Sequence, residues 1–348
     1  MTQPRGKNLN AALARALDNR KSQRTIRSLT IQPPNSVDFS SNDFLSLATS
    51  QELRDLYLEE LRTGPSTVHL GSGGSRLLDG NSTYAEQLED DIAAFHRAEK
   101  GLLCNSGFDA NVGLFSCLPQ PRDVIVYDDF IHASVHDGMR LSRAGQKIVF
   151  AHNSADALKS VIEQLIDNDQ AIVTGHRNVF IAVEAVYSMD GDVAPLKDIV
   201  DVIHNLLPLG NGHLIVDEAH SNGVLGPQGR GLVCELGLED QTSVLLHTFG
   251  KALACNGGTL MYQISRSIQT DSTTAIILCS PLIRQYLINY ARPLIYTTFL
   301  SYPALAAIKT SYTYLSSGKT EIVRTKRVLY ENAILTEIVT SSRAISPP

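Results

Sequence analysis

Residues 243–258 read Ser-Val-Leu-Leu-His-Thr-Phe-Gly-Lys-Ala-Leu-Ala-Cys-Asn-Gly-Gly, an apolar run followed by one lysine in a loop of small residues. Residues 244–246 have the length and apolar character of a buried strand, and the Gly257–Gly258 pair is typical of a tight loop. Lys251 is therefore predicted to lie just beyond a strand end. Burial disfavours the ammonium form, which suits such a lysine to imine formation with an aldehyde and to proton transfer. Taken alone, however, a lysine in this setting is more often a solvated loop residue.

A second segment is an apolar strand that ends in a carboxylate. Residues 213–221 read His-Leu-Ile-Val-Asp-Glu-Ala-His-Ser, with Asp217 at the expected strand end and His220 three residues later. Pyridoxal phosphate needs such a partner, because its pyridine nitrogen must stay protonated for the ring to accept electrons from a substrate carbanion. Asp217 could hold that proton while Lys251 holds the aldehyde carbon.

Three motifs strengthen this interpretation. Residues 217–221 read Asp-Glu-Ala-His-Ser, residues 223–231 read Gly-Val-Leu-Gly-Pro-Gln-Gly-Arg-Gly, and residues 248–251 read Thr-Phe-Gly-Lys. Together they resemble the cofactor motifs of the α-oxoamine synthases, a family of fold-type I pyridoxal-phosphate enzymes. The resemblance extends over residues 8 to 315 and is more specific for the cofactor than for the substrate. It implies that the chain binds pyridoxal 5'-phosphate and acts as a homodimeric acyltransferase.

The resemblance also implies roles for individual residues. Lys251 would hold the cofactor and move the α-proton, Asp217 would keep the ring nitrogen protonated, and His132 would stack on the ring. The residues expected to be catalytic are Lys251, His132, Asp217 and His220. The residues expected to bind the cofactor are Gly107, Phe108, His132, Ser188, Asp217, His220, Thr248, Lys251 and Thr298. In the family, the threonine matching Thr298 reaches the phosphate of the neighbouring subunit.

The expected phosphate site is a turn between a strand and a helix. Residues 101–104 predict a short strand, and residues 105–111 (Asn-Ser-Gly-Phe-Asp-Ala-Asn) open a helix. Unpaired backbone N–H groups and the helix dipole make such a helix start an anion site. The resemblance assigns the amides to Gly107 and Phe108. Without it, an ordinary strand-to-helix turn explains the pattern as well.

Other chemistries fit the sequence less well. In the glycine-rich segment 71–76, Arg76 occupies the third glycine position of a dinucleotide motif, and no apolar strand leads into it. No nucleotide-binding G-x-x-x-x-G-K-[ST] motif occurs, so the Asp-Glu-Ala-His quartet does not indicate a helicase. His132 and His136 have helical spacing for a metal pair, but no third ligand of matching spacing follows. We therefore expect no metal site.

Predicted strands and helices alternate between residues 100 and 260. The strands are expected at residues 101–104, 124–127, 147–150, 179–183, 213–217, 244–246 and, displaced beyond them, 275–278. This alternation favours an α/β domain around a mostly parallel sheet. Ligands bind such sheets at the carboxyl ends of the strands, where the chemically interesting residues are expected. The predicted fold is that of a fold-type I pyridoxal-phosphate transferase, with a large domain and a small, truncated C-terminal domain.

The composition is that of an ordinary globular protein. The chain has 348 residues, of which 43% are hydrophobic and 19% charged, and a formal net charge of −6. This charge gives no electrostatic attraction for nucleic acid, and no apolar run reaches the length of a membrane span. We expect neither nucleic acid nor a membrane as a partner. The five cysteines form no C-x-x-C pair, which favours buried, reduced thiols.

The N-terminal region allows two interpretations. Leu9, Leu13 and Leu17 recur as on one face of an amphipathic helix, but the excess of arginine and lysine also fits a mitochondrial transit peptide. We favour the structural helix and a cytoplasmic protein, with mitochondrial or peroxisomal location as alternatives. The family resemblance implies substrate contacts by Arg27, near the acyl group, and by Asn42, at the amino-acid carboxylate. Asn42 also fits a plain turn.

The sequence departs from the family at two places. Residues 259–274 form a polar, turn-rich insertion close behind Lys251. The C-terminal end at Pro348 leaves no counterpart for the family arginine that grips the substrate carboxylate. The expected domains are an N-terminal helical arm (residues 1–45), a large cofactor-binding domain (46–292, with the insertion) and a partial C-terminal domain (293–348).

The resemblance implies a decarboxylating condensation of an amino acid with an acyl-CoA. Alanine and pimeloyl-CoA are the first expectation, as in biotin biosynthesis. Related enzymes that use glycine with another acyl thioester, or a polyketide substrate, are the nearest alternatives. The rival from another class is a remnant that folds, binds the cofactor and does not turn over.

Overall fold

The computed structural model describes residues 7–31, 33, 36–65, 69–255, 274–321 and 323–324. The chain divides into two compact units, one formed by Met1–Phe39 with Leu260–Thr270 and the other by Ser40–Thr259 with Asp271–Pro348. The first unit contains helix α1 (Lys7–Ser22), where the sequence predicts one. The three leucines of its expected apolar face, Leu9, Leu13 and Leu17, are exposed.

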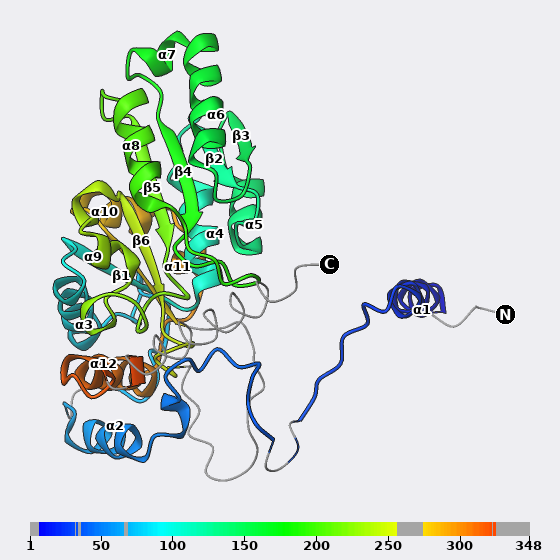
Figure 1. The fold of residues 1–348 in the computed structure, drawn as a ribbon. Coiled ribbons are helices and arrows are strands. Elements are labelled where there is room, and N and C mark those ends of the chain that lie inside the picture. Colours follow the sequence, from blue (N-terminus) through cyan, green and yellow to red (C-terminus); the bar gives the residue numbers. More distant parts are fainter. Residues whose placement is uncertain are drawn as a thin grey trace, which may run out of the picture. The chain divides into compact units, whose positions relative to one another are not determined.

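The second unit is built on a seven-stranded sheet with the order β1-β7-β6-β5-β4-β2-β3 (Figure 1). The strands are β1 (Lys100–Cys104), β2 (Val124–Asp128), β3 (Gln146–Phe150), β4 (Val179–Glu184), β5 (Gly212–Asp217), β6 (Val244–Thr248) and β7 (Ala275–Cys279). Strands β2 to β6 pair in parallel, whereas β7 is antiparallel to both of its neighbours. The expected α/β fold with a mostly parallel sheet is confirmed.

Helices alternate with these strands along the chain. They are α2 (Gln51–Thr63), α3 (Thr83–Phe95), α4 (Gly107–Cys117), α5 (Ala133–Leu141), α6 (Ala155–Asn168), α7 (Gln170–Val173), α8 (Leu196–Leu206), α9 (Leu232–Leu236), α10 (Pro281–Tyr290), α11 (Arg292–Tyr296) and α12 (Tyr302–Ser316). Serine side chains cap several of them, and Ser82 accepts a hydrogen bond from the Ala85 N–H at the start of α3.

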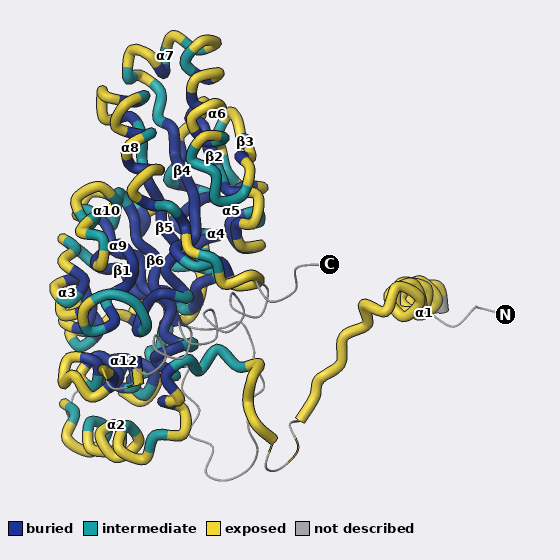
Figure 2. The backbone as a smooth tube through the Cα atoms, viewed as in Figure 1, coloured by how far each residue is buried: buried dark blue, intermediate teal, exposed yellow. Residues whose placement is uncertain are grey.

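The two faces of the sheet have separate cores. Leu114 of α4, Val135 of α5 and Leu287 of α10 pack on one face, whereas Ile92 of α3 and Ile162 of α6 pack on the other. Because both faces are covered, the middle residues of the central strands are apolar, and all of β4 is buried (Figure 2). This burial explains why the strands appear in the sequence as continuous apolar runs.

The region after Lys251 is tied to the sheet through Thr274. Residues 256–273, which hold the Gly257–Gly258 pair and most of the expected insertion, lie outside the described residues. Thr274 is buried, its carbonyl accepts from the Phe249 N–H at 2.9 Å, and its hydroxyl donates to the Cys255 carbonyl at 3.2 Å. Thr274 therefore continues the pairing of β6 with β7, and we place the end of the insertion before it.

The cysteines and the helices bear on two further expectations, buried reduced thiols and the lack of a membrane span. All five cysteines are buried free thiols. Among the described helices, none is both long enough and apolar enough to cross a membrane.

Candidate active site

The carboxyl ends of three parallel strands bring the predicted residues together. Glu184 ends β4, Asp217 ends β5 and Thr248 ends β6. Glu184 and Asp217 are direct partners in the register between β4 and β5. Because neighbouring residues in register point to the same face of a sheet, the two carboxyl groups lie side by side.

Asp217 is a buried carboxylate with specific donors. The Asn111 side chain donates to its Oδ2 at 2.8 Å, and the Ala219 N–H donates to its Oδ1 at 3.0 Å. Asn111 lies on α4 and is itself buried among apolar residues. These bonds hold the carboxylate at the strand end while leaving oxygen lone pairs for a further donor.

A hydrogen-bonded chain connects Asp217 to His132. The Asn111 amide also donates to Ser134 Oγ at 3.0 Å, and Ser134 Oγ lies 2.7 Å from His132 Nδ1. The Ser134 N–H donates to the same Nδ1 at 3.2 Å. Because the Ser134 N–H donates to Nδ1, this nitrogen is an acceptor, so the Ser134 hydroxyl also donates to it and the N–H of the ring is on Nε2. The exposed His132 side chain is thereby oriented, and its ring lies 6.4 Å from that of Phe108.

Glu184 is a site residue that the sequence did not single out. It is buried, and the His132 backbone N–H hydrogen-bonds to it. Burial, followed by the negative charge of Asp217, raises the pKa of Glu184 to about 8, while the charge of Lys251 opposes this shift. Glu184 therefore holds its proton near neutral pH. The sequence feature that could have identified Glu184 is a carboxylate at the end of a predicted strand, directly before a loop.

His220 is held as a neutral imidazole. Burial, followed by the positive charge of Lys251, lowers its pKa to about 3. Its ring lies 5.7 Å from that of Phe44, so the segment that contains Asn42 approaches the turn after β5. A neutral ring can donate one hydrogen bond and accept another.

Lys251 lies in a tight turn directly after β6. The Cys255 N–H donates to the Phe249 carbonyl at 2.7 Å, and the Ala254 N–H donates to the Lys251 carbonyl at 3.0 Å. Ala254 has a positive φ of 52°, which marks the sharp reversal of the chain. Lys251 is half-buried, and its charge acts on both Glu184 and His220. The predicted position of the lysine beyond a strand end is confirmed.

The expected phosphate loop is the start of α4. The helix begins at Gly107, and Ser106 caps it by accepting from the Asp109 N–H at 2.9 Å. A Cβ atom on Gly107 would lie 2.6 Å from Cγ2 of Thr248, so only glycine fits against the end of β6. The Thr248 hydroxyl is 3.4 Å from the Ala219 carbonyl. The first turn of α4 is thus set beside Thr248, and the assignment of its amides to a phosphate stays a prediction.

The other four predicted site residues have no described hydrogen bond to the catalytic residues. Ser188 is exposed in the loop after β4, and Thr298 is exposed, with its carbonyl accepting from the Asn105 amide at 2.7 Å. Arg27 belongs to the first unit, where it is exposed. Asn42 is half-buried in a turn, with its carbonyl accepting from the Phe44 N–H at 2.9 Å.

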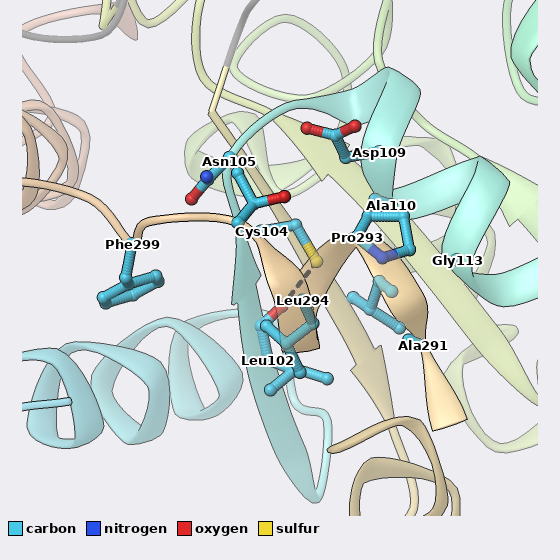
Figure 3. A pocket seen from close by; sticks show the side chains of 12 residues that line it. Leu102, Cys104, Asn105, Asp109, Ala110, Gly113, Ala291, Pro293, Leu294 and Phe299 are labelled. Carbon is cyan, nitrogen blue, oxygen red and sulfur yellow. Dashed lines mark hydrogen bonds between the residues drawn. The ribbon is translucent and has the colours of Figure 1, made fainter. Parts of the chain in front are cut away.

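A cavity lies beside the α4 start, between β1, β7 and α11. Cys104, Asn105 and Asp109 line its polar side, and Leu294 and Phe299 line its apolar side (Figure 3). It has none of the four expected catalytic residues in its lining. No cluster of metal-ligating side chains occurs in the part of the chain that the structure describes.

The donor set fits pyridoxal phosphate. A lysine for the aldehyde, a buried carboxylate for the ring nitrogen, an oriented histidine for the ring face and a helix start for the phosphate lie around one end of the sheet. This fold and this set of groups define a fold-type I pyridoxal-phosphate enzyme.

Comparisons with known proteins agree with this class. The family model for aminotransferase class I and II matches residues 34–341. An 8-amino-7-oxononanoate synthase from Emericella nidulans is 55% identical over 318 residues, which are 91% of this chain and 73% of that protein. The aminoacyl transferase sphA from Aspergillus fumigatus is 39% identical over 312 residues, which are 89% of this chain. The chain spans only 63% of the length of sphA.

Solved structures give the same result. An 8-amino-7-oxononanoate synthase from Francisella tularensis superposes with a TM-score of 0.58 and 27% identity, covering 81% of this chain and 70% of that chain. A serine palmitoyltransferase from S. paucimobilis with bound PLP and myriocin has a TM-score of 0.70 and 23% identity. The match covers 89% of this chain and 73% of that chain. The latter likeness concerns the fold.

The chain belongs to the aminotransferase class I and II family, and within it to the pyridoxal-phosphate-dependent α-oxoamine synthases. The expectations for family, fold class and cofactor are confirmed.

Proposed function

We propose that this protein is an acyl-CoA:amino-acid C-acyltransferase of the 8-amino-7-oxononanoate synthase type, acting in biotin biosynthesis. It would condense alanine with pimeloyl-CoA and release CO₂ and coenzyme A. The observation that supports this most strongly is the 55% identity to the Emericella nidulans synthase over 91% of the chain. The arrangement of Lys251 and Asp217 at the ends of adjacent strands supplies the matching chemistry.

The protein groups would divide the work as follows. Pyridoxal phosphate, when bound, supplies a ring that delocalises the electron pair of a substrate carbanion. Lys251 Nζ would bind the aldehyde carbon and then move the α-proton. Asp217 would hold a proton on the ring nitrogen, and His132, with its ring proton on Nε2, would cover the ring face. His220 and Ser188 would donate to the phenolic oxygen.

The phosphate would be bound by the start of α4. The amides of Gly107 and Phe108 and the hydroxyl of Thr248 would surround it, since unpaired N–H groups of a helix start favour an anion. In a homodimer, Thr298 of the neighbouring subunit would complete this site. Arg27 and Asn42 would contact the acyl donor and the amino-acid carboxylate.

A second candidate is an α-oxoamine synthase with another pair of substrates. The 39% identity to aminoacyl transferase sphA favours keeping this alternative, with glycine or a polyketide acyl group in place of the biotin precursors. A protein that binds the cofactor without turnover remains the third candidate.

A substrate assay separates these candidates. The purified full chain with pyridoxal phosphate is incubated with pimeloyl-CoA and alanine, and in parallel with glycine or with acetyl-CoA. Release of free coenzyme A thiol is measured together with the mass of the condensation product. We expect the fastest release with alanine and pimeloyl-CoA, on the order of 1 per second. A preference for glycine supports the second candidate, and no release with any pair supports the third.

A further inference from the structure

Two ionisable side chains lie directly behind the cofactor-facing ends of β5 and β6. Glu218 follows Asp217, and His247 precedes Thr248. The side chains of a strand alternate between the two faces of the sheet. Asp217 shares the face of Ile215, which packs with α4, whereas His247 shares the face of Leu245, which packs with α3. The pair therefore lies on the opposite face of the sheet from the candidate site.

Both side chains are completely buried, and each has atoms that lack a hydrogen bond. Glu218 Oε2 and both ring nitrogens of His247 have no hydrogen-bond partner. His247 Nε2 lies 3.4 Å from Glu218 Oε2, slightly beyond hydrogen-bonding distance for a well-aligned pair. A buried polar atom without a hydrogen bond destabilises the folded protein. Because Glu218 Oε2 and His247 Nε2 lie close together, a proton between them would give both atoms a partner.

The other Glu218 oxygen fixes the surrounding loops. Oε1 accepts from the Val233 N–H at 3.0 Å and from the Ser221 hydroxyl at 3.0 Å. Val233 lies in the first turn of α9, and Ser221 lies in the turn that carries His220. Gly231, with a φ of 98°, packs directly against this carboxyl group, and any Cβ there would overlap it. Glu218 thus connects the turn after β5 to α9.

Further polar groups enclose the pair. The His96 and His247 rings lie with centroids 4.1 Å apart and planes tilted by 34°, and His96 Nε2 lies 2.9 Å from the Tyr312 hydroxyl of α12. His96 Nδ1 lies 3.0 Å from the Arg230 carbonyl. Asn222 donates to the Thr248 carbonyl at 3.2 Å and also hydrogen-bonds to Tyr312. The titratable and charged residues that face the pair are Asp217, His96, Arg230 and Tyr312.

We propose that Glu218 and His247 share one proton between Oε2 and Nε2, and that this pair positions the cofactor residues on the other face of the sheet. Through Glu218 it would fix Asp217 and the His220 turn, and through His247 it would fix Thr248 and the Lys251 turn. Both are positioning residues, because neither reaches the candidate site itself. The expected effect on cofactor binding rests on the proposed function, whereas the shared proton does not.

The electrostatic environment agrees with a neutral pair. Burial raises the pKa of Glu218 to about 7, with the Val233 N–H as the main opposing influence. Burial, and then the charge of His96, lowers the pKa of His247 well below its ordinary value. Below neutral pH, the proton therefore resides on Glu218 and is donated to His247. As the pH rises through about 7, Glu218 loses its proton to solvent, the ring proton of His247 moves from Nδ1 to Nε2, and Nε2 donates to the Glu218 carboxylate.

The shared proton can be tested on the cofactor-free protein. Infrared difference spectra are recorded between about pH 5 and pH 8 for the wild type and for Glu218→Gln. We expect a protonated-carboxyl band that decreases as the pH rises and that is absent from Glu218→Gln. Because Glu184 also titrates in this range, Glu184→Gln serves as the reference for its band. If Glu218→Gln shows the same carboxyl bands as the wild type, the shared proton does not exist.

The positioning role is tested by the affinity for pyridoxal phosphate, measured by equilibrium dialysis. Glu218→Gln keeps an acceptor for the Val233 N–H and gains a donor for His247, so we expect affinity within about threefold of the wild type. Glu218→Met removes the interactions of the carboxyl group with Val233, Ser221 and His247, and we expect about tenfold or more weaker binding. Glu235→Met, the same change at an exposed position, is the control. Equal affinity of folded Glu218→Met and the wild type would overturn the positioning role.

The two hypotheses fail in different ways. If the wild type binds no pyridoxal phosphate although its far-ultraviolet circular dichroism shows a folded protein, the proposed function fails. The infrared result still decides the shared proton in that case. If Glu218→Met does not fold, the infrared comparison and the Glu218→Gln affinity remain, and a large loss of affinity in Glu218→Gln would contradict our account.

Discussion

At the scale of single residues, the raised pKa of Glu184 is the main electrostatic feature of the candidate site. Glu184 and Asp217 end adjacent strands in register, and Asp217 takes the donors Asn111 and Ala219. Glu184 accepts a hydrogen bond from the His132 N–H, and the negative charge of Asp217 raises its pKa. Glu184 therefore holds its proton near neutral pH, and the proposed partner of a ring nitrogen is Asp217.

This arrangement predicts a pH dependence of stability. The pKa of Glu184 in the folded protein, about 8, lies above its value in an unfolded chain. Its contribution to stability is thus fully present below the unfolded pKa and is lost as the pH rises through about 8. Relative to Glu184→Gln, which cannot titrate, the free energy of unfolding of the wild type should fall by roughly 1–3 kcal/mol between pH 5 and pH 8.

The measurement is urea unfolding of the cofactor-free proteins at a series of pH values. Glu163→Gln, which changes a glutamate on α6 that forms a surface ion pair with Lys159, is the matched control. Its curve should run parallel to that of the wild type. If the curve of Glu184→Gln also runs parallel, Glu184 is not the group that holds the proton.

At the scale of elements, the start of α4 and the end of β6 form one unit. The helix starts at Gly107 because Ser106 caps it, and the strand ends at Thr248 against the same glycine. The sequence predicted both elements from their local patterns. It could not predict that they touch, because the contact depends on how α4 packs on the sheet.

This contact predicts the effect of a single methyl group. In Gly107→Ala, the new Cβ would lie 2.6 Å from Thr248 Cγ2, and the overlap should cost about 1–3 kcal/mol. We expect the affinity for pyridoxal phosphate to fall about tenfold or more. Thr248→Ser removes Cγ2 and keeps the hydroxyl, so the double variant should regain most of the affinity. Dialysis of the three variants checks this, and a double variant no better than Gly107→Ala would argue against the contact.

The hydrogen-bonded chain from Asp217 to His132 could also be predicted only in part, because its contacts depend on packing. The sequence indicated both ends, since Asp217 ends an apolar strand and His132 matches a family residue. The linking residues Asn111 and Ser134 were missed, although a buried asparagine in an apolar helix was a visible signal. Asn111 and Asp217 are 106 positions apart, and only the packing of α4 on β5 brings them together.

At the scale of the whole molecule, the alternation of strands and helices was sufficient to predict the class of fold. The parallel pairing then follows, because each helix returns the chain to the same end of the sheet. The antiparallel β7, the pairing of Thr274 with Phe249 and the separate unit that holds α1 required the structure. The assignment of the three expected domains and of the individual site residues stays a prediction.

Lys251 is expected to bind the cofactor aldehyde. The full chain is incubated with pyridoxal phosphate, reduced with borohydride and digested, and the modified peptide is identified by mass spectrometry. Lys251→Arg, which keeps the positive charge, is the control and should remain unlabelled at this peptide. Our account predicts one stable adduct per chain, on Lys251. An adduct on another lysine, or no adduct in a folded wild-type protein, would contradict it.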